Sequence, residues 1–344
     1  MDGLLRANTL LNYKGLSMDK RNRIGNEPSN RQRNAWTRNI DLSGKAGRLL
    51  FVAIFGLSLL LAAPIVGGAD EAVHERLAFS LGNAWRLDLF PAEGIYDPYI
   101  ADPLRPGFSL MQMDIMDSDI PDAGESRYSF MLGGKYGFFK FRHSDLPDMA
   151  VQVDIYGAFL GQFDLENSTD NIGWDGFYGV MFTWTGGDGL SLKLAMQHDS
   201  SHVGDEYAER TGRLRINYTR EEIAFGLSYR FPEYFRVYSE AGYGHNLRNT
   251  ELQRPWRVKG GIEFEAPDRF FNGRLGYYAA VDLSSTEEMD WETDVTVQTG
   301  VVLPMRRFSH TVRIGPIYRN GRSVIGEFFQ HKEEWWGMGM WIDM

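Results

Sequence analysis

The chain has 344 residues, no cysteine, 43% hydrophobic residues and a formal net charge of −10 at pH 7. The lack of cysteine excludes disulfides, thiolate zinc sites and a lipid anchor on cysteine, and the hydrophobic content excludes gross disorder. Residues 1–69 hold 10 basic and 4 acidic side chains, so the acidic excess lies in the remainder. This balance excludes nucleic acid as an expected partner, because phosphate binding needs a basic surface.

The first predicted element is an export signal within residues 1–69, which we interpret as an N-terminal extension followed by a signal peptide. An uncharged run at 49–68 follows Lys45 and Arg48, and small residues at 66–69 offer a cleavage site. A basic region, an apolar stretch and a small-residue cut occur in this order in secretory signals. The run is long enough for a single membrane anchor, but the proline near its end favours cleavage.

The next segment, residues 70–106, contains LFPAEGIYDPYIADPLRPG and is rich in proline and aspartate. Such a composition predicts irregular structure. We expect either a periplasmic lead-in to the following region or a plug inside it.

Residues 107–344 alternate between apolar and polar side chains with period two. In 149–163, for example, Val151, Val153 and Ile155 share one parity, whereas Gln152 and Asp154 share the other. This pattern predicts β-strands and places no apolar stripe on a helix. A water-soluble sandwich also alternates, but here the strands are about ten residues or longer and their connections alternate between short and long, as in membrane barrels.

The sequence therefore predicts an all-β fold, a transmembrane antiparallel β-barrel of about 12 strands with a range of 10–14. The expected strands are 107–116, 127–142, 149–163, 174–184, 189–200, 212–229, 234–245, 255–265, 274–284, 293–303, 308–318 and 334–344. An even strand count places both barrel termini on the periplasmic side of the outer membrane of a Gram-negative-type bacterium. The apolar and aromatic C-terminal strand resembles the signal read by the barrel-assembly machinery, although Met344 stands where a phenylalanine is usual. Outer-membrane lipids are the other expected partner, and nothing indicates an oligomeric state.

One motif carries residues suited to catalysis, QHDSSHVGDEY at 197–207. The apolar even-numbered residues before it define the lipid-facing side of the strand, and the same parity gives His198, Ser200 and His202. A serine nucleophile needs an adjacent base and a third group to orient that base. On the next strand Asn217 is the first candidate for this group and Glu221 the second.

Two other interpretations of the motif stay open. The residues could only shape an outer loop around Gly204. They could instead bind a cation such as calcium, with nitrogen and oxygen ligands from His198, His202, Asp205 and Glu206.

His198-x-Ser200 near the outer end of a barrel strand resembles outer-membrane phospholipase A and is similar to the lipid A deacylases. This resemblance implies Ser200 as nucleophile, His198 as base and Asn217 as the orienting residue, while Ser201 departs from the asparagine of those families. LFPAEGIYDPYIADPLRP, GQFDL at 161–165 and QHDSSHVGDEY resemble an uncharacterised bacterial outer-membrane family classed as a domain of unknown function. That resemblance implies an exported barrel and no known activity.

The sequence therefore leaves two alternative functions open. The first is hydrolysis of acyl esters of membrane lipids at the outer wall, of the phospholipase A or lipid A deacylase type. The second is a small channel or structural barrel without catalysis, which the charged residues of the inward parity would also suit.

Overall fold

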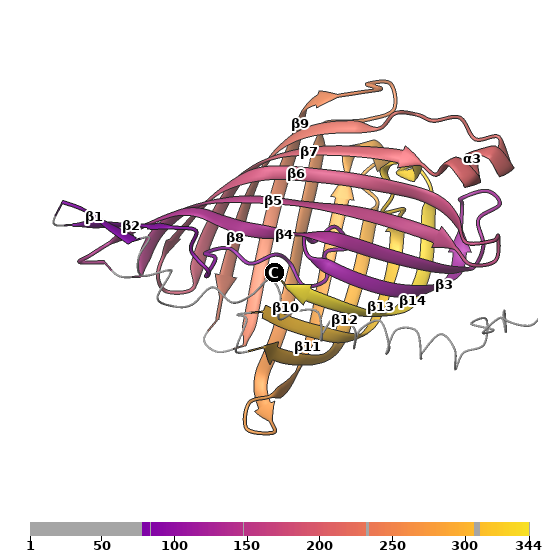
Figure 1. The fold of residues 1–344 in the computed structure, drawn as a ribbon. Coiled ribbons are helices and arrows are strands. Elements are labelled where there is room, and N and C mark those ends of the chain that lie inside the picture. The colour runs from indigo at the N-terminus through magenta and orange to yellow at the C-terminus, as the bar shows by residue number, and fades with distance from the viewer. Residues whose placement is uncertain (1–77, 83, 147, 232–233, 306–309, 344) are drawn as a thin grey trace, which may run out of the picture. The chain divides into compact units, whose positions relative to one another are not determined.

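The computed structural model describes residues 78–343, except 83, 147, 232–233 and 306–309. Within them, twelve strands form a closed antiparallel barrel in which each strand pairs with the next and the last pairs with the first (Figure 1). The predicted all-β barrel of about twelve strands is confirmed. The strands are β3 (Phe108–Ser118), β4 (Ser126–His143), β5 (Met149–Asp164), β6 (Asp170–Gly186), β7 (Leu190–Val203), β8 (Thr219–Arg230), β9 (Phe235–Leu247), β10 (Trp256–Phe270), β11 (Leu275–Thr286), β12 (Thr293–Met305), β13 (His310–Arg322) and β14 (Lys332–Asp343).

The two ends of the barrel differ in their connections. Tight turns lie at the end where β14 finishes, which we call the turn end; β6 and β7, for example, are joined by residues 187–189 alone. The opposite end, the loop end, carries α3 (Asp205–Thr211), η2 (Glu287–Met289) and η3 (Gly326–Phe328). The predicted alternation of shorter and longer connections holds for most of the barrel, but β5 and β6 are joined at the loop end by residues 165–169, no more than the 144–148 turn between β4 and β5.

Apolar side chains cover the outside of the barrel, and many polar ones line its inside. On β11, Tyr277 and Leu283 are each 43% exposed on the outer face, whereas Tyr278 and Asp282 are each 1% exposed on the inner face. An outer apolar face with a polar interior is the reverse of what water favours, and it is the pattern of barrels surrounded by lipid.

The clearest difference from the predicted strands is the start of β8, which begins at Thr219 rather than at residue 212. Gly212 ends α3 with φ 72°, and Asn217 also adopts a left-handed conformation with φ 55°. These two positions break the extended chain, so Leu214 is 85% exposed instead of continuing an apolar row. Residues 214–218 therefore belong to a loop, which explains why their apolar side chains have the opposite parity to those of β8.

The segment before the barrel begins with a hairpin of β1 (Ala78–Leu81) and β2 (Trp85–Leu89), whose second strand pairs with the turn end of β4. Residues 90–107 then run along the inner wall. The hydroxyl of Tyr99 donates to Glu240 of β9 at 2.9 Å, and the backbone N–H of Ile100 donates to Glu263 of β10 at 2.6 Å. The chain between the hairpin and β3 thus occupies the interior of the barrel.

Ion pairs hold this interior segment. Asp102 pairs with Lys259, and Arg105 pairs with Asp343 at 2.7 Å. Burial by itself raises the pKa of Asp102, but the charge of Lys259 more than offsets it and holds that pKa below its usual value. The carboxylate is therefore ionised in its buried site. A cavity of about 160 Å³ remains between the segment and the wall.

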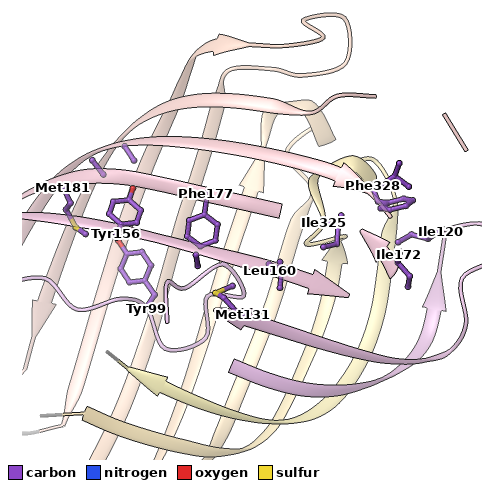
Figure 2. Packing of buried hydrophobic residues seen from close by; sticks show 14 of the residues in the cluster. Tyr99, Ile120, Met131, Tyr156, Leu160, Ile172, Phe177, Met181, Ile325 and Phe328 are labelled. Atoms are coloured by element: carbon purple, nitrogen blue, oxygen red, sulfur yellow. The ribbon is translucent and has the colours of Figure 1, made fainter. Parts of the chain in front are cut away.

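The main apolar cluster also lies inside the barrel (Figure 2). Towards the loop end, Ile325 and Phe328 of the β13–β14 connection are fully buried together with Ile120 and Ile172 (Figure 2). Tyr207 of α3 joins them, and its hydroxyl donates to the carbonyl of Pro121 at 2.5 Å. These contacts fill the loop end with side chains.

The predicted signal peptide lies outside the described residues, as does all of 1–69. Among the residues described, no helix combines the length and the apolar composition needed to cross a bilayer.

Candidate functional site

The His-Ser motif lies on the outward face of β7, in the half of the strand nearest the loop end. Leu194 and Met196, which precede it on the same face, are 47% and 54% exposed. Ala195 and Ser201, on the opposite face, are buried. The motif therefore begins where the apolar outer surface ends, as the parity of the sequence predicted.

His198 is held by a carboxylate from the neighbouring strand. The register of β7 and β8 places His198 opposite Glu221, and its Nδ1 atom lies 2.6 Å from Oε1 of Glu221. On the other side the imidazole stacks on Tyr178 of β6, with ring centroids 4.9 Å apart. The His198 and Glu221 side chains are 24% and 31% exposed, so the pair is partly shielded yet reachable from outside.

Ser200 lies between two histidines on the same face. Its Oγ atom is 3.2 Å from Nε2 of His202, and His198 lies two residues away in the other direction. The ring of His202 packs against Trp174 at 4.2 Å between centroids. The buried Nδ1 atom of His202 has no hydrogen-bond partner among the described residues. His198 therefore has a carboxylate at its Nδ1 atom, whereas His202 has no partner there among the described residues.

The side chains beside Ser200 leave it open to the outside. The register places Gly176 of β6 on one side of Ser200 and Thr219 of β8 on the other. Gly176 has no side chain, and a Cβ atom added there would meet nothing within 4 Å. A substrate could therefore approach the hydroxyl over this glycine.

Ser201 faces the opposite way and ties β7 to the interior. Its hydroxyl donates to Asp175 of β6 and accepts the backbone N–H of Glu327 in η3 at 2.8 Å. Asp175 also accepts the N–H of Gly326 at 2.8 Å. This serine stands where the resembling families have asparagine, and here it fastens the β13–β14 connection.

The two candidates for the orienting group occupy different positions. Glu221 contacts His198 directly, whereas Asn217 lies in the loop before β8 with φ 55°. The sequence ranked them in the opposite order because the parity break before β8 could not be located by pattern alone.

The residues expected to bind a cation do not converge. Asp205 and Glu206 are exposed in the first turn of α3, and Asp205 pairs with Arg215 at 3.6 Å. In the described part of the chain, no group of three or more His, Asp or Glu side chains is arranged to hold a metal ion.

Sequence reasoning did not single out Trp174, Gly176 or Tyr178. They belong to the outward parity of β6, and the register of β6 with β7 sets them beside His202, Ser200 and His198 in turn. The short β6–β7 turn could have indicated this register, since the turn length fixes the pairing of a hairpin.

The outward face thus brings together a serine, a histidine of the same strand and a carboxylate 2.6 Å from the Nδ1 atom of that histidine. The fold around it is that of an outer-membrane-type β-barrel. Residues 71–343 match the family described as "Protein of unknown function (DUF1207)", and the chain belongs to that family.

Solved structures with the same fold are distant in sequence. An active-site variant of outer membrane phospholipase A from Escherichia coli is 13% identical, covering 73% of this chain and 95% of that chain, with a TM-score of 0.50. The KdgM porin is 8% identical, covering 69% of this chain and 99% of that chain, with a TM-score of 0.37. A comparison with curated protein sequences finds no match. The likeness to the phospholipase A variant shows a shared barrel fold and no more.

Proposed function

We propose that this barrel hydrolyses acyl esters of membrane lipids, with Ser200 as nucleophile, His198 as general base and Glu221 as the residue that orients the base. The observation that carries the proposal is the 2.6 Å contact of Glu221 with Nδ1 of His198 on the outward face that also presents Ser200. This contact favours the tautomer with its proton on Nδ1, which leaves Nε2 free to accept a proton.

The reaction follows from these roles. Oγ of Ser200 attacks the ester carbonyl while its proton passes to Nε2 of His198. The protonated imidazole then gives that proton to the leaving alcohol as the carbon–oxygen bond breaks, and the acyl group remains on Ser200. A water molecule attacks the acyl-serine with His198 again taking a proton, and the fatty acid leaves while the proton returns to Ser200.

His198 serves as the base rather than His202, despite the 3.2 Å contact of Ser200 with His202. His202 has no partner at Nδ1 among the described residues, so its tautomer is not set by the protein. The proposed step requires the Ser200 hydroxyl to rotate about the Cα–Cβ bond from His202 towards His198, and serine has three staggered rotamers for this bond.

The position of the site supports a membrane lipid as substrate. Tyr178, at 63% exposure, and Met196, at 54%, border it on the side of the apolar surface, so it lies at the edge of that surface. The ester bonds of a bilayer lipid lie between the acyl chains and the headgroup, so a site at the edge of an apolar surface suits them. The proposal therefore includes insertion in the outer membrane of a Gram-negative-type bacterium after export through a signal peptide, with the barrel-assembly machinery and outer-membrane lipids as partners.

The test uses the full barrel in detergent micelles and measures fatty acid released from a diacyl phospholipid and from lipid A. We expect Ser200→Ala and His198→Ala to lose at least about 10³-fold of the activity, and Glu221→Gln roughly 10²–10⁴-fold. His202→Ala should lose far less than His198→Ala.

Matched controls are Ser239→Ala and His245→Ala, which remove the same side chains from exposed positions on β9 and should keep full activity. Folding is checked by the heat-dependent gel mobility of the barrel. Activity that survives Ser200→Ala in a folded barrel would refute the assignment. A wild-type protein that releases no fatty acid from either lipid would favour the alternative, a channel or structural barrel.

A further inference from the structure

A row of outward positions crosses the barrel wall through Ser200. Ser200 pairs with Gly176 of β6, Gly176 pairs with Phe159 of β5, and Phe159 pairs with Leu132 of β4. Phe159 is 38% exposed and Leu132 is 52% exposed. With adjacent strands about 4.8 Å apart, this row extends roughly 14 Å from the hydroxyl over a glycine to apolar side chains.

Gly176 makes a gap in this row. An added Cβ atom there would meet nothing within 4 Å, whereas every other described glycine within a barrel strand has a neighbouring atom within that distance. Two outward glycines on the neighbouring strand β5 differ from Gly176. Gly161 is covered by the ring of Phe130, and Gly157 lies against Tyr178. The surface over Gly176 is therefore open where the surfaces over its neighbours are filled.

Two pairs of rings border the gap. On the loop-end side, Trp174 packs against His202, with centroids 4.2 Å apart. On the other side, Tyr178 stacks on His198 at 4.9 Å. We call the open position between these pairs, with Gly176 as its floor, the Gly176 notch. Ser200 lies beside it on β7 and Phe159 lies beside it on β5.

We propose that the Gly176 notch receives the acyl chain of the ester that Ser200 attacks, and that Gly176 determines the specificity for long chains. This inference rests on the proposed function. An acyl chain is apolar and narrow, so it can follow a floor without a side chain and reach the exposed faces of Phe159 and Leu132. An acetyl group is too short to use these contacts. The kcat/KM of hydrolysis should therefore rise with acyl-chain length, because a longer chain makes more contacts along this row.

The test fills the notch without disturbing the fold. Gly176→Ala adds a Cβ atom into open space, and Gly176→Leu extends the side chain further over the same position. Activity of the full barrel is measured on dipalmitoyl phosphatidylcholine in mixed micelles and on p-nitrophenyl acetate. We expect Gly176→Leu to lower kcat/KM for the palmitoyl ester at least about tenfold more than for the acetyl ester, with Gly176→Ala between it and the wild type.

Ser239→Leu is the control, because it adds the same side chain to an exposed outward position of β9. It should leave the ratio of the two kcat/KM values as in the wild type. Equal losses of Gly176→Leu on both esters, or no loss on either, would overturn the notch proposal while Ser200→Ala still tests the catalytic serine. If Ser200→Ala keeps its activity on both esters, the catalytic assignment fails and the notch proposal fails with it.

Discussion

Ser200 and Ser201 are adjacent in sequence and have opposite surroundings. Ser200 points outward beside His202, whereas Ser201 is 1% exposed and bonded to Asp175 and to the backbone of Glu327. The cause is the alternation of a β-strand, which sends successive side chains to opposite faces of the sheet. One serine is therefore available for chemistry and the other for stability.

This separation predicts different defects for two otherwise identical substitutions. Ser201→Ala leaves the carboxylate of Asp175 and the N–H of Glu327 without their shared hydroxyl, which should destabilise the barrel by about 1–3 kcal/mol. Ser200→Ala should change stability by less than about 0.5 kcal/mol. Urea unfolding of the two variants in the same detergent checks this. Equal stability of both variants would contradict the structural role of Ser201.

At this scale the sequence predicted which face His198, Ser200 and His202 share, because parity follows from strand geometry alone. It did not rank Glu221 above Asn217. That order depends on where β8 begins, and left-handed positions at Gly212 and Asn217 decide it. Asparagine and glycine tolerate such a conformation, but many asparagines and glycines do not adopt it.

At the scale of elements, all twelve predicted strands are observed, and their bounds agree to within about five residues except at the start of β8. The twelve strands are long and regularly patterned, and turn residues separate them. The two-residue hydrophobic period and the turn residues therefore locate each strand. Residues 90–107 have no such period. Their course along the inner wall depends on contacts with residues far away in the sequence, such as Glu240, Glu263 and Lys259.

Tyr99 should be the main anchor of this interior segment. Its ring stacks on Tyr238 of β9 with centroids 3.8 Å apart, and its hydroxyl donates to Glu240. Tyr99→Ala should weaken the attachment by about 3–5 kcal/mol, since it removes a buried aromatic ring. Tyr99→Phe keeps the ring, loses one hydrogen bond to a charged acceptor and should cost about 1.5–3 kcal/mol.

Limited proteolysis measures the attachment, because a detached segment exposes its backbone to the protease. We expect cleavage within 90–107 to accelerate in the order wild type, Tyr99→Phe, Tyr99→Ala. Phe90→Ala, at a position 51% exposed, is the control and should cleave at the wild-type rate. Cleavage of Tyr99→Ala at the wild-type rate would show that the ion pairs alone hold the segment.

At the scale of the whole barrel, the side chains and the segment inside it determine whether the barrel can conduct as a channel. The segment 90–107 and the cluster around Phe328 occupy it, and a cavity of about 160 Å³ is lined by charged side chains that are largely paired with each other. A barrel of twelve strands is narrow enough for side chains to block its lumen. The surface that a large substrate can reach is therefore the outer wall, which carries the Ser200 site.

This arrangement predicts that the intact barrel conducts no steady current in a planar bilayer. Deleting residues 91–106 alone should leave the barrel silent, because the side chains around Phe328 still fill the loop end, and a stable pore should require the loss of both. Variants of Ser200 should stay silent like the wild type, since that residue faces outward. A steady conductance of the wild-type barrel would favour the channel alternative instead.

The sequence by itself determined the class of fold, the number of strands and the face of most strand residues, because alternation along a strand is a local property of the chain. Only the tertiary structure decided which strands' side chains meet. The contact of Glu221 with His198, the gap at Gly176 beside Ser200 and the course of residues 90–107 join positions far apart in the sequence or on different strands. Register and packing set such contacts, and neither is encoded in the pattern of a single strand.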